Sequence, residues 1–281
     1  MLFDILRIVL VSILLTLVVA TVLVFTQGAK DMEGTGGLDF TKTLEGGAAT
    51  PAPLQTVPMR DGYPLQVRTY GGADDVPLLV LVHGSGWHGQ QFDALGKALQ
   101  GHADVIVPDL RGHGTAPGRR GDVDYVGQLE DDLADLVTAV AKPGQKVIMG
   151  GHSSGGGLVV RFAGGLHGDM LDGAVLLAPF LKYNAPTVRE NAGGWTHALT
   201  RRIIGLSILN TFRITALNHL PVIQLDMPRA VLDGPLGDTA TTSYSYRLNC
   251  RTWQHCRRLF CWQEVRTRLS SLRNMRPQWA R

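Results

Sequence analysis

The stretch KVIMGGHSSGG, residues 146–156, decides the fold of this 281-residue chain. It opens with a short apolar run, residues 146–149, which is typical of a strand buried on both faces of a sheet. A segment with helical spacing, residues 156–163, follows. Between them, residues 151–155 match the motif G-x-S-x-G, in which a strand turns sharply into a helix and presents a serine hydroxyl at the carboxyl end of the sheet. The stretch therefore predicts an α/β protein with Ser153 as the candidate nucleophile.

The turn around this serine needs small residues on both sides, because strand and helix approach each other closely there. Gly151 and Gly155 supply them, and His152 completes the motif. The helix N-terminus behind Ser153 favours negative charge that develops during a reaction. The alternative interpretation is a glycine-rich turn with a structural role only.

Strands and helices alternate along the chain on both sides of the motif. One run alternates apolar and polar residues, as a half-buried strand does, and the others are continuously apolar. This rhythm predicts a mostly parallel sheet covered by helices on both faces. The expected strands are residues 65–70, 77–82, 103–107 (ended by Pro108), 146–149 and 173–177, and the expected helices are residues 91–99, 125–140 and 156–163.

A second glycine-rich turn, His83-Gly84-Ser85-Gly86, ends the strand at residues 77–82. In a G-x-S-x-G fold, an oxyanion hole takes one backbone N–H from the residue after the nucleophile and one from an earlier strand-to-helix loop. We therefore expect Ser154 to give the first N–H. We expect the second from Ser85, with Gly86 as the next choice.

Three motifs together make the chain resemble the α/β-hydrolases of the lysophospholipase, monoglyceride-lipase and serine-aminopeptidase-like group: LVLVHGSG ending at Gly86, VPDLRGHG (107–114) and GGHSSGG (150–156). The resemblance covers residues 54–180 and implies a serine hydrolase core there. It also implies that Asp109 and His113 shape a loop rather than react. Finally, it implies that residues 181–249 form a lid or cap segment, in which residues 199–212 have the pattern of an amphipathic helix.

The N-terminus predicts a membrane anchor. Residues 8–25 are apolar or hydroxyl residues without a charge, and roughly 20 such residues span a bilayer as a helix. A cleaved signal peptide ending at Ala20 is the alternative, but the apolar run continues past that point. We expect residues 1–27 to be a single-pass anchor with the catalytic domain on the non-cytoplasmic side. Residues 28–53, rich in Gly, Thr, Ala and Pro, read as a linker.

The C-terminal tail differs from the rest of the chain. Residues 250–281 hold eight Arg, one acid (Glu264) and all three Cys, which gives this tail a net charge of +7. Since the whole chain carries +3, residues 1–249 carry −4. The resembled family places an acid and a histidine on two further strands, and only His255 follows here, in no strand pattern. We interpret the tail as a replaced or out-of-frame end, so that the sheet lacks its last strands. A basic amphipathic helix at a membrane surface is the alternative.

These observations predict a membrane-anchored serine hydrolase that cleaves carboxylic or lipid esters through an acyl-enzyme, impaired because the acid and histidine of the triad are missing. A non-catalytic binding protein, or a membrane-surface protein that uses the basic tail, are the alternatives. With 44% hydrophobic residues and three Cys, the chain is neither disordered nor a disulfide scaffold. We expect no cofactor, no metal and no nucleic-acid partner.

Overall fold

The computed structural model describes residues 1–28, 51–114, 118–125, 127–181, 196–225 and 243–244. The chain divides into two compact units. One unit comprises residues 39–117, 127–190 and 255–281, and the other comprises residues 1–38, 118–126 and 191–254. The expected linker lies mostly, and the expected C-terminal tail entirely, outside the described residues.

The first unit is built on a six-stranded sheet in the order β1-β2-β4-β3-β5-β6. The pairs β3–β4, β3–β5 and β5–β6 are parallel, whereas β1–β2 and β2–β4 are antiparallel. The mostly parallel sheet predicted from the sequence is therefore confirmed. The strands are β1 Leu54–Pro58, β2 Pro64–Tyr70, β3 Leu78–Val82, β4 Asp104–Asp109, β5 Val147–His152 and β6 Gly173–Leu177.

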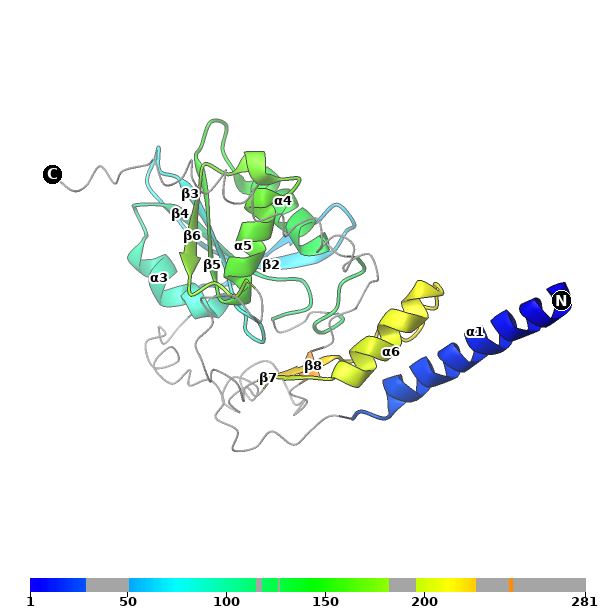
Figure 1. Cartoon of the computed structure of the whole chain (residues 1–281). Helices are drawn as coiled ribbons and strands as arrows, with labels where there is room; N and C mark the ends of the chain where they lie inside the picture. Colours follow the sequence, from blue (N-terminus) through cyan, green and yellow to red (C-terminus); the bar gives the residue numbers. More distant parts are fainter. Residues whose placement is uncertain (29–50, 115–117, 126, 182–195, 226–242, 245–281) are drawn as a thin grey trace. The chain divides into compact units, whose positions relative to one another are not determined.

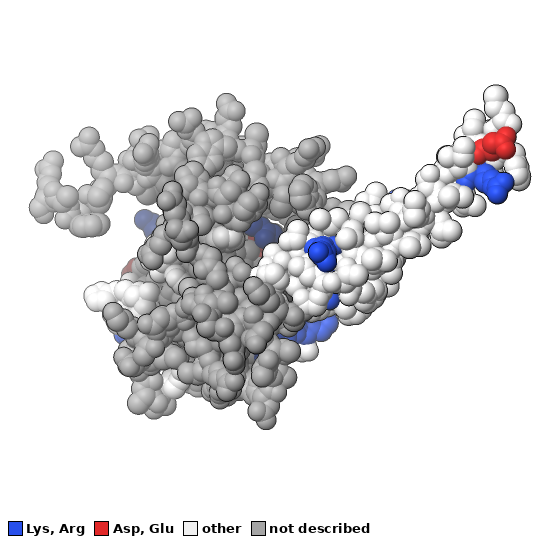
Figure 2. Space-filling view, turned by 60° about the horizontal axis from the view of Figure 1, so that its bottom comes forward, with Lys and Arg blue, Asp and Glu red and all other residues white. Residues whose placement is uncertain are grey.

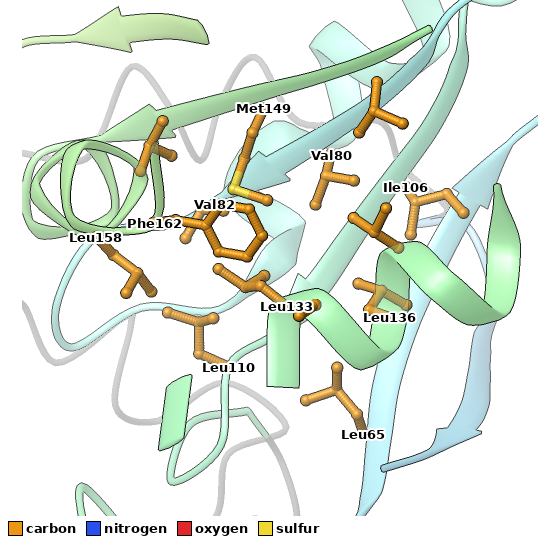
Figure 3. Packing of buried hydrophobic residues seen from close by; sticks show 14 of the residues in the cluster. Leu65, Val80, Val82, Ile106, Leu110, Leu133, Leu136, Met149, Leu158 and Phe162 are labelled. Atoms are coloured by element: carbon orange, nitrogen blue, oxygen red, sulfur yellow. The ribbon is translucent and has the colours of Figure 1, made fainter. Parts of the chain in front are cut away.

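Helices cover both faces of this sheet (Figure 1). On one face, α4 (Gln128–Val140) and α5 (Ser154–Gly164) pack on the main apolar cluster, which Figure 3 shows from close by. On the other face, the short helix η1 (Gly89–Phe92), which continues into α3 (Asp93–Ala98), lies over a second cluster. A further short helix, η2 (Gly168–Met170), precedes β6. Alternate residues of β3 belong to the two clusters, as the period of two in a buried strand requires.

The bounds of the expected strands and helices lie within three residues of the prediction; two of the differences have a clear cause, and one strand was missed. Pro108 does not end its strand: it pairs with Val67 of β2, and it is tolerated because β3 pairs with β4 only as far as Ile106. Helix α4 begins at Gln128 rather than at residue 125, since Gly127 has a φ of 100°, which breaks the helix. Strand β1 was not predicted, because its sequence, LQTVP, is neither continuously apolar nor strictly alternating.

The second unit contains α1 (Leu2–Phe25), α6 (Thr200–Thr211) and a small antiparallel sheet. Helix α6 coincides with the amphipathic helix expected at residues 199–212. The small sheet, which was not expected, orders its strands β7 (Thr196–Ala198), β8 (Ile223–Leu225) and β9 (Ser243–Tyr244). Figure 2 shows the surface of α1 as uncharged along nearly its whole length.

Candidate active site

Ser153 lies between the last residue of β5 and the first residue of α5. Its φ of 52° and ψ of −121° belong to a region that residues with a side chain rarely adopt. Hydrogen bonds hold the strained residue in place. Its N–H donates to the Leu177 carbonyl (3.1 Å), and its own carbonyl accepts from Gly157 (3.1 Å) and Phe180 (2.8 Å). This is the strained strand-to-helix turn that presents a nucleophile.

The glycines of the turn have no room for a side chain. A Cβ on Gly155 would overlap the carbonyl oxygens of Val82 and His83, and one on Gly151 would overlap the backbone at Gly155. Because these neighbours are backbone atoms, they cannot turn aside as a flexible side chain would. The requirement for small residues inferred from the sequence therefore has a geometric cause.

The loop after β3 lies directly against the turn. The hydroxyl of Ser85 donates to that of Ser154 over 2.8 Å, and a Cβ on Gly84 would lie 3.3 Å from the Cβ of Ser153. Ser154 is the first residue of α5, where backbone N–H groups have no partner within the helix. The structure thus brings together the two residues expected to form an oxyanion hole, Ser85 and Ser154, and Gly86 follows Ser85 in the same loop.

Gln91 was not identified from the sequence, although it connects this loop to the turn. Its Oε1 accepts the Gly84 N–H (3.2 Å), and its Nε2 donates to Nδ1 of His152 (2.6 Å). The first bond occupies the Gly84 N–H, and the second holds the His152 ring in one orientation and assigns its proton to Nε2. Burial lowers the pKa of His152, so the ring is neutral. No local pattern marks a glutamine for this role, because its partners lie up to 61 residues away.

Two further histidines near the loop are neutral as well. His83 is fully buried; its Nδ1 donates to the Gly84 carbonyl (2.8 Å) and its Nε2 accepts from the Leu110 N–H (3.0 Å). Burial lowers the pKa of His83 well below its usual 6.5. Burial also lowers the pKa of His88 to about 4, and its Nδ1 accepts from the Gln90 N–H (3.4 Å) at the start of η1. His83 is therefore committed at both ring nitrogens to holding loops in place, and His88 at Nδ1.

Asp109 has the loop-shaping role that the family resemblance implied. Its Oδ1 accepts from the Arg68 guanidinium (2.9 Å) and from the Gly89 N–H (2.6 Å). A Cβ on Gly114, whose φ is +80°, would lie 2.7 Å from Oδ2. Asp109 thereby joins β2, the end of β4 and the start of η1. Nδ1 of His113 likewise contacts a backbone carbonyl, that of Arg111 (3.1 Å).

Within the described part of the chain, no imidazole is hydrogen-bonded to the Ser153 hydroxyl. His167 is paired with Asp131 (2.7 Å), and His255 lies outside the described residues. In the same ranges, no three His, Cys, Asp or Glu side chains gather as metal ligands. The site therefore shows a nucleophile turn and an adjoining backbone loop, without a histidine bonded to the Ser153 hydroxyl among the described residues.

The family comparison agrees with this geometry. The model of the family described as serine aminopeptidase, S33, matches residues 74–227, which is more than half of the chain. The chain belongs to the serine aminopeptidase S33 family. It has the α/β-hydrolase fold, and by family it is a serine hydrolase.

Individual relatives of this S33 family member match only in part. Esterase PIR7B of Oryza sativa subsp. japonica is 32% identical over 146 residues, 50% of this chain and 51% of the esterase. An uncharacterized protein of Mycobacterium tuberculosis is 33% identical over 115 residues, 38% of this chain and 33% of that protein. The chain thus spans between a third and half of the length of these curated relatives.

Solved structures likewise resemble about half of the chain. A thermophilic esterase from Thermogutta terrifontis is 28% identical, with a TM-score of 0.40 over 48% of each chain. A soluble variant of monoglyceride lipase from Saccharomyces cerevisiae, in complex with a substrate analog, is 24% identical, with a TM-score of 0.41 over 50% of each chain.

Proposed function

We propose that this chain is a membrane-anchored serine hydrolase in which Ser153 attacks the carbonyl of a carboxylic or lipid ester and forms an acyl-enzyme. The observation that carries the proposal is the strained backbone of Ser153 at the β5–α5 turn, with Ser85 and Ser154 in contact beside it. The tetrahedral oxyanion would accept hydrogen bonds from the backbone N–H of Ser154 and from that of Ser85 or Gly86.

The activity of the chain as written is proposed to be strongly impaired. A serine hydroxyl is a poor nucleophile until a base removes its proton and a third group orients that base. His152 does not act as that base, because its ring is hydrogen-bonded to Gln91. His83 does not serve either, because both of its ring nitrogens are bonded to backbone.

The membrane part of the proposal rests on α1. This helix is the one described helix that is long and apolar enough to cross a membrane, a test that a signal sequence or a buried core helix also passes. Its C-terminal third packs against α6: Ala20 and Val24 are buried in one cluster with Leu206 and Leu209. Cleavage after Ala20 would divide that cluster, which favours an anchor that remains attached.

A fluorophosphonate probe tests the nucleophile. We expect Ser153 to be the only residue that reacts, if any residue does, and Ser153→Ala to abolish that labelling. Ser207→Ala is the matched control, since that hydroxyl donates to the Ile203 carbonyl one turn earlier in α6 and lies outside the proposed chemistry. Labelling that persists in the Ser153→Ala chain would refute the assignment.

A non-catalytic binding protein is the second candidate function. The observation that favours it is the commitment of His83, His88 and His152 to structural hydrogen bonds. Under this function, neither wild-type chain nor Ser153→Ala would react with the probe.

A further inference from the structure

A single side chain, that of Gln91 in η1, joins the loop after β3 to the nucleophile turn. Its Oε1 accepts the Gly84 N–H over 3.2 Å, and its Nε2 lies 2.6 Å from Nδ1 of His152. Gly84 itself lies close to the turn, because a Cβ on it would be 3.3 Å from Nδ1 of His152 and 3.3 Å from the Cβ of Ser153. One amide group thus contacts both the loop and the ring beside the nucleophile.

The direction of these hydrogen bonds allows one arrangement of protons. A backbone N–H only donates, so the Gln91 atom that faces Gly84 is the carbonyl oxygen. The amide nitrogen then faces His152 and donates to it, which requires that Nδ1 of the ring carries no proton. Neutral His152 with its proton on Nε2 satisfies both bonds. Burial favours this neutral form, since it lowers the pKa of His152 below its usual 6.5.

A proton on Nδ1 of His152 is incompatible with this arrangement. Two N–H donors would then face each other across 2.6 Å. Rotation of the Gln91 amide by half a turn would bring its oxygen to His152, but it would bring the amide nitrogen to the Gly84 N–H instead. One hydrogen bond is lost in either case, and a donor left without a partner away from water is unfavourable. Gln91 therefore holds Gly84 only while Nδ1 of His152 is unprotonated.

Gly84 is a point at which the candidate oxyanion-hole loop is held. Its carbonyl accepts from Nδ1 of His83 (2.8 Å) and from the Trp87 N–H (3.4 Å), while its N–H bonds to the glutamine amide. The next two residues, Ser85 and Gly86, are those expected to give the second oxyanion N–H. Loss of the bond at the Gly84 N–H frees the backbone directly before these two groups.

We propose that Gln91 is a positioning residue that couples the oxyanion-hole loop to the protonation of His152. The loop is held at Gly84 while the imidazole is neutral, and it is released when Nδ1 gains a proton. This inference rests on the proposed function, because it concerns the loop expected to supply the second oxyanion N–H. It goes further, since it makes the geometry of that loop depend on pH.

Other titratable or charged side chains lie around the loop: His83 and His88 on the loop itself, Asp109 and His113 at and after the end of β4, and Arg68 on β2. On the β6 side, His152 pairs with Leu177, which does not titrate. The start of α5, residues 154–157, holds one serine and three glycines. Burial lowers the pKa of His83 and of His88 as well, so the experiment has to identify which proton releases the loop.

Selective isotope labelling isolates the Gly84 amide in the full chain, kept in one detergent. With ¹³C in the histidine carbonyl and ¹⁵N in glycine, a filtered NMR spectrum contains the glycines that follow a histidine: Gly84, Gly89, Gly114 and Gly168. Gly168 is the internal reference and reports that the chain is folded, since its N–H donates to the backbone carbonyl of Gly165 (3.4 Å).

The measurement is the rate of hydrogen exchange of Gly84 divided by that of Gly168, from about pH 8 to about pH 4. The ring ¹⁵N shifts of His152 are followed in parallel. We expect the exchange ratio to rise about tenfold as the His152 ring gains its proton, which is the effect of losing one typical hydrogen bond.

Variants at residues 91 and 152 separate the two bonds. Gln91→Leu removes both, so the exchange ratio of Gly84 should be high at every pH. Gln91→Glu keeps an acceptor for Gly84 but cannot donate to His152, so Nδ1 should carry a proton already at neutral pH while the ratio stays low. His152→Phe cannot gain a proton, so its ratio should stay low in acid. Gln90→Leu, one residue earlier in η1, is the matched control and should follow the wild-type chain.

Each outcome decides the proposal. A constant exchange ratio while the His152 ring gains its proton would overturn the coupling. A rise that persists in His152→Phe would overturn it too, because the proton would then belong to another group, such as His83 or His88. An unprotonated Nδ1 in Gln91→Glu would show that residue 91 does not set the tautomer. Failure of the proposed function looks different: no fluorophosphonate labelling of Ser153 in any of these chains would favour the non-catalytic function, while the Gly84 signal would still decide the coupling.

Discussion

The turn around Ser153 and the outer edge of β6 belong to one sheet, but the turn is closely packed whereas the β6 edge is partly exposed. Every glycine from Gly155 to Gly157 meets backbone or a proline where its Cβ would be, and Gln91 and Ser85 tie the turn to its neighbouring loop. On β6, Val175 and Leu177 are 45% and 37% exposed, and β6 is the last strand of the sheet among the described residues.

The difference shows which half of a hydrolase site the described residues complete. The nucleophile turn is closed by its own neighbours, by the loop after β3, and by the segment at the end of β6, where Leu177 and Phe180 bond to the Ser153 backbone. The acid and base of a triad come from strands beyond β6 in the family that the chain resembles. If the β6 side is as exposed as it is in the described residues, changes at the turn and in the core should have larger effects than changes on β6.

The largest expected effect concerns catalysis. Loss of the base from a serine triad costs about 10⁶-fold in turnover, or roughly 8 kcal/mol. We therefore expect the wild-type chain and Ser153→Ala to hydrolyse p-nitrophenyl butyrate at the same rate. A wild-type turnover on the order of 10 per second would show that a base is present. His255, followed by His88, would then be the first residues to mutate.

The next effect concerns the face covered by α4. Leu133 is fully buried in the main cluster, so Leu133→Ala removes apolar contacts and leaves a cavity. We expect the free energy of unfolding to fall by about 2–5 kcal/mol, measured by urea titration in one detergent. A loss below about 1 kcal/mol would mean that this face packs loosely.

A smaller loss is expected at the nucleophile turn. Gly155→Ala forces a methyl group against two backbone carbonyls and should destabilise the chain by about 1–3 kcal/mol. Gly164→Ala, at the other end of α5, has nothing within 4 Å of the new Cβ and is the matched control. Equal stability of the two variants in a urea titration would contradict the close approach at the turn.

Lowering the pH should reduce the free energy of unfolding through His83, in the loop after β3. The pKa of His83 is depressed in the folded chain, so below about pH 6.5 the unfolded chain binds a proton that the folded chain does not. Stability contributed by neutral His83 is complete above that pH and falls by up to about 1.4 kcal/mol per pH unit below it. Unfolding measured between pH 7 and 5, roughly the window of a histidine, should show a shallower slope in His83→Gln. Parallel slopes would exclude His83 as a cause.

The smallest effect is expected at the edge strand. Val175→Thr should change the free energy of unfolding by less than about 0.5 kcal/mol, because Val175 is partly exposed. The same substitution at Val80, fully buried on β3, should cost about 1–3 kcal/mol. A comparable cost at both positions would show that further residues cover β6.

Much of the fold could be predicted because its signals are local. The buried strands showed as apolar runs, and the G-x-S-x-G turn identified Ser153 together with the two elements around it. The periodicity of residues 199–212 predicted helix α6, but it did not indicate that α6 packs against α1. The predicted start of α4 and the predicted end of β4 before Pro108 were wrong, since both depend on the conformation or pairing of a single residue.

The sequence by itself determined the order of strands and helices, the nucleophile turn and the apolar length of α1, because the signal for each element lies within a dozen or two consecutive residues. Only the tertiary structure decided that Gln91 orients His152, that Asp109 joins two strands to η1, and that Gly205 and Arg202 seat α6 on α1. The physical reason is distance along the chain. These contacts join groups between 20 and 185 residues apart (the latter Gly205 and Ala20), and a hydrogen bond or close approach of that kind leaves no periodic trace in the sequence.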